Sequence, residues 1–438
     1  MPGLFLGRPY RQMLSPPSSR LAPLRVASFR RLAASYLINE LGDWVGRIAL
    51  AILVLERTGS PLATAALFLA MTVLPALPGP ALVATLDRLE VRATLAVLFV
   101  LEALLLGGIG LLAASVPVAV ILLLAAADGA IALAGRTLTR ASVAATLKPS
   151  GQLRAGNALL NICLTTSMAA GPALAGLILG AWGVRTALLL DGLSFLVASL
   201  LLATASQLRT ARGKHEDGSW LERLRAGWTY VAERPILARL VAAEAAAFVF
   251  FTITVPVDVV YARDVLGGGD AGVGILLAAW GAGAVLGGLC FIGARGRSLT
   301  FLLTASTLAI AAAFLGMAAA PTLAVACVAA LVGGLGNGVQ WVALLSAVQE
   351  LTGLDFQARV IGLLEALGAA APGIGFVAGG LSAALLSPRF SYLLAGLGVL
   401  AVTALSARSI LRLRRPAPLA ADAQPGLGTA AASSLEAT

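Results

Sequence analysis

Long apolar stretches follow one another along the chain, with short polar segments between them. Many of these stretches reach twenty residues or more, which is enough for a helix to cross a bilayer. The pattern predicts an all-α membrane protein with twelve transmembrane helices, expected at residues 32–55, 62–86, 93–114, 117–136, 155–180, 184–205, 239–261, 271–294, 299–320, 322–348, 360–386 and 390–407.

The longest polar interruption, residues 206–238, divides these helices into a six-helix N-terminal half (32–205) and a six-helix C-terminal half (239–410). Its segment WLERLRAGWTYVAERP predicts an amphipathic surface helix. We interpret residues 1–31 as a basic cytoplasmic tail and residues 411–438, rich in Ala, Pro, Gly and Ser, as a disordered one.

A weak internal repeat relates the two halves. The segment AAGPALAGLILGA (169–181) aligns with GIGFVAGGLSAAL (373–385), with Ala175 over Ala378, an offset of 203 residues. Two repeated six-helix halves are typical of transporters whose site lies at the interface between the halves. The sequence therefore predicts a pseudo-symmetric fold.

The distribution of Lys and Arg predicts the orientation of the helices. The segments on one side of the predicted membrane carry 26 of these residues and the other side carries four; the one residue left over, Arg47, lies within a predicted helix. The positive-inside rule places the rich side, with both termini, in the cytoplasm. The net charge of +10 is thereby explained without a nucleic-acid partner.

The composition argues against an enzyme. Only 12% of the residues are charged, against about 25% in soluble proteins. The single histidine, His215, lies in a polar loop, and the three cysteines are scattered through the predicted helices. The glycine-rich segment 267–272 lacks the strand-to-helix setting of a nucleotide loop. We therefore expect no catalytic residues, no metal site and no cofactor.

The segment NELGDWVGR places costly polar groups inside the first predicted helix. At 100° per residue, Asn39, Glu40, Asp43 and Arg47 share an arc of roughly 100°. Asp43 lies about 17 Å along the helix, close to the middle of a bilayer. Gly42 and Gly46 flank this face, where a neighbouring helix could approach.

Two interpretations of this polar face remain open. Intramembrane charges usually serve function, so Asp43, tuned by Arg47 and Glu40, is the first candidate to exchange a proton during transport. Alternatively Asp43 and Arg47, four residues apart, form a fixed ion pair that holds helices together.

Other embedded polar residues are weaker candidates. Asp128 is a further proton-coupling candidate. Asn337 and Gln340 share a helix face beside Trp341 and, with Asn39, are candidates for the substrate cavity. Asp258 is expected to be solvated near the outer end of its helix, and FVFFTITVP (248–256) to be apolar packing before a proline kink. We expect structural or water-facing roles for Glu102, Asp191, Glu244 and Glu365.

The loop PALVATLDRLEVRATL resembles the cytoplasmic loop signature of the major facilitator superfamily, in which an acid and basic residues clamp neighbouring helices. Asp87, Arg88 and Arg92 match that pattern, whereas Val83 and Glu90 stand where the superfamily usually has glycines. The resemblance implies a cytoplasmic gating role for these three residues and for Arg359 in the matching loop of the second half.

Further segments, among them LGDWVGRIALAILVLERTGSP and LRAGWTYVAERPIL, resemble the enterobactin-exporter-like and macrolide-efflux-like branch of that superfamily. GPALAG (171–176) is similar to the fifth-helix motif of its proton antiporters, although Ser167 replaces one glycine. Gly171, Pro172 and Gly176 are accordingly interpreted as a helix-packing motif. The resemblance implies that helices 1, 4, 7 and 10 line a central cavity.

Together these observations predict a monomeric secondary transporter of a bacterial inner membrane. It is expected to export small, partly hydrophobic molecules, drug-like or siderophore-like, by proton antiport and alternating access. Its expected partners are the small-molecule substrate, protons and the lipid bilayer. The alternatives are an importer or uniporter of a small metabolite, and a non-transporting receptor on the same fold.

Overall fold

The computed structural model describes residues 21–76, 78–86, 89–205, 208, 220–294, 297–353 and 356–412. Within these ranges the chain is all-helical. Its α-helices are α1 Ala27–Thr58, α2 Pro61–Thr72, α3 Gly79–Leu86, α4 Val91–Leu111, α5 Val118–Leu147, α6 Leu153–Ala203, α7 Trp220–Ala232, α8 Pro235–Thr252, α9 Val257–Val260, α10 Gly269–Gly293, α11 Leu299–Ala319, α12 Leu323–Leu351, α13 Gln357–Leu385 and α14 Pro388–Arg412.

The helices account for the predicted twelve membrane passes. Nine apolar helical stretches in the described part of the chain are long enough to cross a bilayer. The helix α6 contributes two passes, because it is interrupted at Gly183, whose φ of 73° reverses the chain. The charged helix α1 and the interrupted segment α2–α3 supply the remaining two passes.

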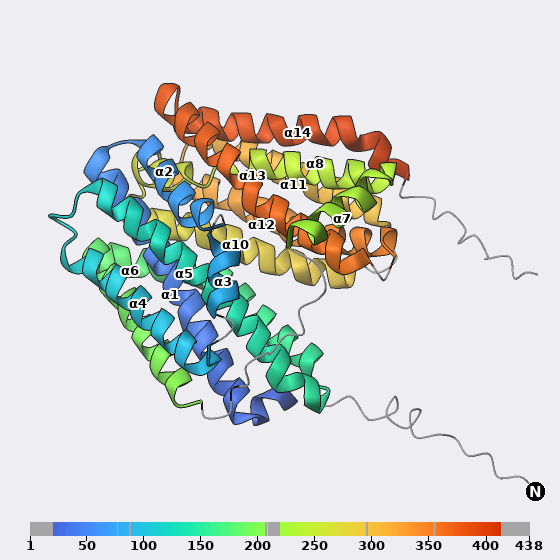
Figure 1. Cartoon of the computed structure of the whole chain (residues 1–438). Helices are drawn as coiled ribbons and strands as arrows, with labels where there is room; N and C mark the ends of the chain where they lie inside the picture. The colour runs from blue at the N-terminus through green and yellow to red at the C-terminus, as the bar shows by residue number, and fades with distance from the viewer. Residues whose placement is uncertain are drawn as a thin grey trace, which may run out of the picture.

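The passes form two halves, α1–α6 and α8–α14, as Figure 1 shows. We call the end that carries Ala27 and Arg412 the terminal end, and the end that carries Gly59 and Gly183 the distal end. The halves lie together at the distal end and diverge toward the terminal end. The helix α6 packs on α10 and α2 packs on α13, so these two pairs join the halves.

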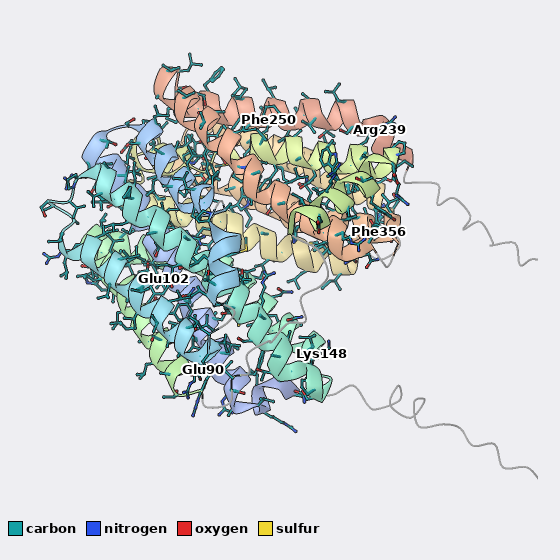
Figure 2. All side chains as sticks on the ribbon, viewed as in Figure 1. Glu90, Glu102, Lys148, Arg239, Phe250 and Phe356 are labelled. Atoms are coloured by element: carbon teal, nitrogen blue, oxygen red, sulfur yellow. The ribbon has the colours of Figure 1, made fainter. Side chains whose placement is uncertain are left out.

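Labelled side chains mark the terminal end of each half. Figure 2 places Glu90 and Lys148 at that end of the N-terminal half, and Arg239 and Phe356 at that end of the C-terminal half. Glu102 lies midway along the N-terminal half in the same view. The helix α7, in the segment between the halves, packs on α13 at the terminal end.

Two predicted helices are interrupted. The continuous helix expected at 62–86 is broken between α2 and α3, where Pro75, Pro78 and Pro80 each remove a backbone donor and restrict the preceding residue. The helix expected at 239–261 stops at Thr252, before Pro256, and resumes as α9 and a π-turn η5, Tyr261–Val265. Such π-turns are rare and often mark functional sites.

The helix α5 is longer than predicted. It was expected to end at residue 136 but continues to Leu147, with Leu138, Val143 and Leu147 buried along the extension. Arg136 therefore lies inside a helix, and its assignment to a terminal loop in the positive-inside count is wrong. Arg47 is not the only embedded arginine.

Candidate functional site

A large cavity of about 2010 Å³ separates the two halves. Its walls come from both halves, and it extends from Leu50 and Asp258 to Asn161 and Ile292, near the terminal ends of α6 and α10. Among the described residues, the charged side chains that line it are Asp43, Arg47, Asp128, Arg136, Asp191 and Asp258. Four carboxylates thus face two guanidinium groups.

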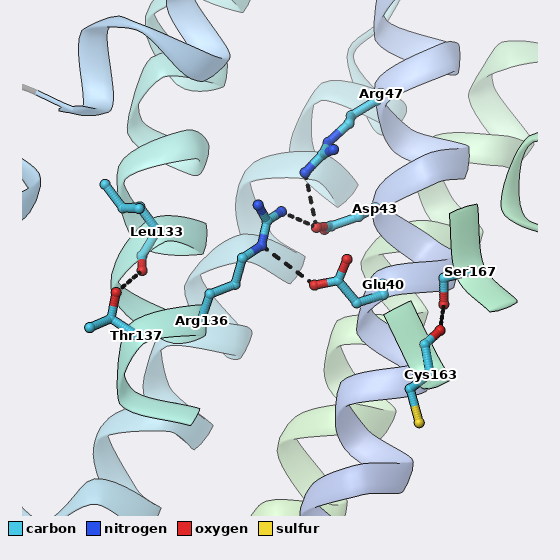
Figure 3. Close-up of polar contacts among 8 residues, drawn as sticks. All are labelled: Glu40, Asp43, Arg47, Leu133, Arg136, Thr137, Cys163 and Ser167. Atoms are coloured by element: carbon cyan, nitrogen blue, oxygen red, sulfur yellow. Dashed lines mark hydrogen bonds and ion pairs between the residues drawn. The ribbon is translucent and has the colours of Figure 1, made fainter. Parts of the chain in front are cut away.

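Asp43 is the centre of an ion-pair network on the cavity wall (Figure 3). Its Oδ2 atom accepts hydrogen bonds from Arg136 of α5 at 2.8 Å and from Arg47 of α1 at 3.3 Å. The Nε atom of Arg136 lies 3.5 Å from Oε1 of Glu40. The predicted pairing of Asp43 with Arg47 is therefore present, and Arg136 ties both carboxylates of α1 to a second helix.

The carboxylates of this network are buried, whereas the guanidinium groups reach the cavity. The side chains of Asp43 and Glu40 are 8% and 6% exposed, against 34% for Arg47 and 38% for Arg136. A buried carboxylate is stable as an ion only with a partner of opposite charge and good hydrogen bonds. The two arginines supply that partner and line the cavity.

Glycines of α1 bring a third carboxylate to the same region. A Cβ atom on Gly46 would collide with the carboxylate of Asp191 on α6, and one on Gly42 would collide with Ser194 and Asp191. The close approach predicted for these glycines thus brings α1 against the second pass of α6. Ser194 donates a hydrogen bond to Asp191 at 3.4 Å.

Four buried carboxylates of the N-terminal half each have an oxygen without a hydrogen-bond partner in the described part of the chain: Glu40, Glu102, Asp128 and Asp191. Of these, Glu40 has the ion-pair contact with Arg136. Asp128 on α5 and Asp191 line the cavity, whereas Glu102 on α4 does not and is only 1% exposed. An unpaired buried carboxylate is far less costly as the neutral acid than as the anion. Asp128 thus faces the cavity with one oxygen that has no hydrogen-bond partner among the described residues.

Of the four predicted substrate-cavity residues, two line the cavity and two do not. Asn337 and Trp341 of α12 line the cavity. Asn39 is buried, and its Oδ1 atom has no hydrogen-bond partner among the described residues. Gln340 lies behind the cavity wall, on a small pocket of about 40 Å³, where its amide donates to Glu244 of α8 at 3.2 Å.

The contact between Gln340 and Glu244 is the counterpart of the contact between Arg136 and Glu40. The same 204 positions separate Glu40 from Glu244 and Arg136 from Gln340. In both halves the acid lies on the first helix and its partner on the fourth. The repeat therefore keeps the contact but replaces the cation of the N-terminal half by a neutral amide.

The predicted gating residues are described only in part. Asp87 and Arg88 lie outside the described residues. Arg92 pairs with Glu90 at 3.2 Å, and both side chains are exposed. Arg359 is exposed on α13, where its guanidinium lies 5.0 Å from the centre of the Phe356 ring.

The distal end is closed by contacts between the halves. Arg263 of η5 forms an ion pair with Glu56 of α1 at 2.7 Å, and on its own half it lies 3.7 Å from Asp264 and 3.3 Å from Asp270. Phe68 of α2 packs on Phe376 of α13, with ring centres 5.7 Å apart.

The predicted packing motif also contributes to this closure. A Cβ atom on Gly176 of α6 would lie 2.8 Å from the Cα atom of Gly274 on α10. The carbonyl of Pro172 lies against Gly274, and Gly171 lies against the Trp44 side chain. Helices meet backbone to backbone only where small residues allow it.

Two residues of the site were missed or misplaced by the sequence reasoning. Arg136 was assigned to a loop, although Asp128, Ala132 and Arg136 recur every four residues as on one helix face. Asp258 was expected only to be solvated, but it also belongs to the site and has a buried partner. Its Oδ1 atom accepts a short hydrogen bond from the fully buried Tyr392, and the side chain lines the cavity.

Solved transporter structures share this fold. A bacterial homologue of the human lysosomal transporter Spinster, inward-facing and unoccupied, matches with a TM-score of 0.69 at 14% identity, over 94% of this chain and 100% of that one. A bacterial homologue of the iron transporter ferroportin, inward-facing, matches with a TM-score of 0.67 at 17% identity, over 88% and 99%.

The nucleoside transporter NupG matches with a TM-score of 0.66 at 13% identity, over 89% of this chain and 100% of that one. No curated protein sequence matches the chain. These identities are low, so the structural matches establish the fold alone.

A family model described as "Transmembrane secretion effector" matches residues 18–426, nearly the whole length of the chain. With the fold, the interrupted helices and the cavity between the halves, this match makes the chain a multi-pass membrane transporter rather than an enzyme. It belongs to the transmembrane secretion effector family of the major facilitator superfamily.

Proposed function

We propose that the protein is a proton-coupled exporter of small, partly hydrophobic molecules in a bacterial inner membrane, acting as a monomer. The observation that carries the proposal is the sharing of one carboxylate oxygen, Oδ2 of Asp43, by Arg47 and Arg136 on the cavity wall. A proton on Asp43 would weaken both contacts and loosen α1 from α5. Occupation by a proton would then change how these helices pack.

The distribution of charge supports the orientation in this proposal. The terminal end carries the excess of Lys and Arg, so the positive-inside rule places it in the cytoplasm. The cavity extends to that end, and the halves meet at the other. The described conformation then receives substrate from the cytoplasm, and rocking of the halves delivers it outward.

Proton coupling supplies the energy in this proposal. One proton moving through the membrane field provides about 2.3 kcal/mol per 100 mV, before any pH difference is added. Protons entering from the outside would reach Asp43 or the cavity-lining Asp128 when the cavity opens to that side. Asp87, Arg88, Arg92 and Arg359 would hold the cytoplasmic side closed in that state.

The proposal is tested in everted membrane vesicles that hold a preformed pH gradient. Adding a transported compound should release the gradient, and Asp43→Asn should abolish that release while the protein still folds. Glu102→Gln is the matched control, since Glu102 is equally buried but does not line the cavity. Release that persists in Asp43→Asn would remove Asp43 from the mechanism, and counterflow without any gradient would favour a uniporter.

A further inference from the structure

Aromatic rings form a continuous cluster on the cavity wall of the C-terminal half. The rings of Trp280 on α10 and Phe314 on α11 stack with centres 5.5 Å apart, and Phe251 of α8 contacts both, at 5.6 Å and 5.8 Å. All three line the cavity. Phe248 extends the cluster, stacking on Phe251 at 5.9 Å.

Asp258 belongs to the same wall. Tyr392 of α14 donates its hydroxyl hydrogen bond to Asp258 and packs on Phe314, with ring centres 6.3 Å apart. One buried tyrosine therefore fixes the carboxylate beside the rings. Asp258 also lies in α9, between the break after Thr252 and the π-turn η5. Transporter binding sites are commonly built where helices are discontinuous in this way.

The charge of this wall is not balanced. In the described part of the chain, no Arg or Lys forms an ion pair with Asp258. The N-terminal wall differs, because two arginines contact Asp43 there. At the position that corresponds to Arg136, the C-terminal half has the neutral Gln340.

We infer that this wall is the binding site for the substrate's charged group, and that the substrate is an organic monocation with an apolar or aromatic body. A carboxylate attracts the positive charge, and aromatic faces bind cations through their negative quadrupoles. The cluster of Phe251, Trp280 and Phe314 receives the apolar body. The cavity volume of about 2010 Å³ admits a bulky cation with water around it.

This inference rests on the proposed function, because it names the class of substrate that the exporter carries. Binding is nevertheless separable from transport. Tetraphenylphosphonium and tetraphenylborate have the same shape and opposite charges, so they isolate the effect of charge. Both are to be measured by equilibrium dialysis against the purified protein in phosphatidylcholine nanodiscs, with empty nanodiscs as the blank.

The wild type should bind tetraphenylphosphonium saturably and tetraphenylborate at least tenfold more weakly. Asp258→Asn should weaken phosphonium binding about tenfold, since the amide keeps an acceptor for Tyr392 but loses the charge. Glu102→Gln is the matched control and should stay within about twofold of wild type, because that buried carboxylate lies in the other half and does not line the large cavity. Trp280→Leu should weaken phosphonium binding several-fold without loss of the folded protein.

Equal phosphonium binding by wild type and Asp258→Asn overturns the inference, as does a wild type that binds neither ion or prefers the borate. If Asp258→Asn does not fold, the inference is decided by two other results: the binding loss in Trp280→Leu, and the preference of the wild type for tetraphenylphosphonium over tetraphenylborate. Proton release driven by another compound, with no phosphonium binding, would refute the inference alone. Phosphonium binding without any proton-coupled transport would refute the proposed function alone.

Discussion

Arg136 donates to the Oδ2 atom of Asp43 at 2.8 Å, and this hydrogen bond joins two helices of the N-terminal half. The same guanidinium lies 3.5 Å from Glu40. One cation therefore serves two buried carboxylates that sit one turn apart on α1. Glu40 depends on Arg136 for its ion pair, whereas Asp43 also has Arg47.

We expect Arg136→Gln to destabilise the protein. Removing one partner of a buried ion pair typically costs about 3–5 kcal/mol, and the partial exposure of Arg136 lowers our expectation to about 2–3 kcal/mol. Thermal unfolding in detergent measures the change. Arg140→Gln, on the exposed next turn of α5, is the control and should change the midpoint little.

A double variant separates charge pairing from packing. Glu40→Gln combined with Arg136→Gln should recover part of the lost stability, because one buried carboxylate no longer lacks its cation. Additive losses in the double variant would mean that Glu40 and Arg136 do not interact.

Gln340→Arg would give the C-terminal half the cation that the N-terminal half already has. The new guanidinium would face Glu244 and add positive charge behind the wall that carries Asp258. For a separation of roughly 10–15 Å and an effective dielectric constant of about 20, binding of tetraphenylphosphonium should weaken about sixfold to sixteenfold. Gln340→Met, similar in volume and uncharged, is the control; equal binding by the two variants would contradict the prediction.

Glu56→Gln should favour opening of the distal end. It removes the ion pair with Arg263 between the halves, and pairs as exposed as this one are worth about 0.2–1 kcal/mol. The balance between the two conformations should therefore shift by up to about fivefold. Spin labels at Leu62 and Leu386, both exposed near this end, would report a larger population at long distance.

The control for this measurement is Glu90→Gln, which breaks an exposed ion pair within the N-terminal half. Labelling requires replacement of the three native cysteines, Cys163, Cys290 and Cys327. A distance distribution that Glu56→Gln leaves unchanged would show that this ion pair does not hold the halves together.

Gly176→Val should destabilise the described conformation. The added side chain would meet the backbone of Gly274, and overpacking of this kind costs about 1–3 kcal/mol. Gly108→Val on α4 is the matched control, since a Cβ atom there has no neighbour within 4 Å. Thermal unfolding should separate the two variants by several degrees, and equal midpoints would refute the backbone contact.

The pattern of apolar stretches was sufficient to predict the fold, because each membrane pass needs its own run of about twenty apolar residues. It failed where prolines interrupt a run without changing its composition, as in α2–α3. It also failed at Arg136, where a charge was taken for the end of a helix. The helix continues past this charge, with Leu138, Val143 and Leu147 buried.

The site could be predicted only within single helices. Helical geometry places Asp43 and Arg47 on one face, and their contact is present. The partners that come from other helices depend on how the helices pack, which a single sequence does not specify. For this reason Tyr392 beside Asp258, and Gln340 beside Glu244, became visible only in the structure.

Arg263 has three acidic neighbours, and only Glu56 belongs to the opposite half. Separation of the halves therefore leaves this guanidinium with Asp264 and Asp270, and never strips it of all counter-charge. The energy barrier to opening therefore contains no penalty for an isolated cation. A contact of this kind can break and re-form in every transport cycle.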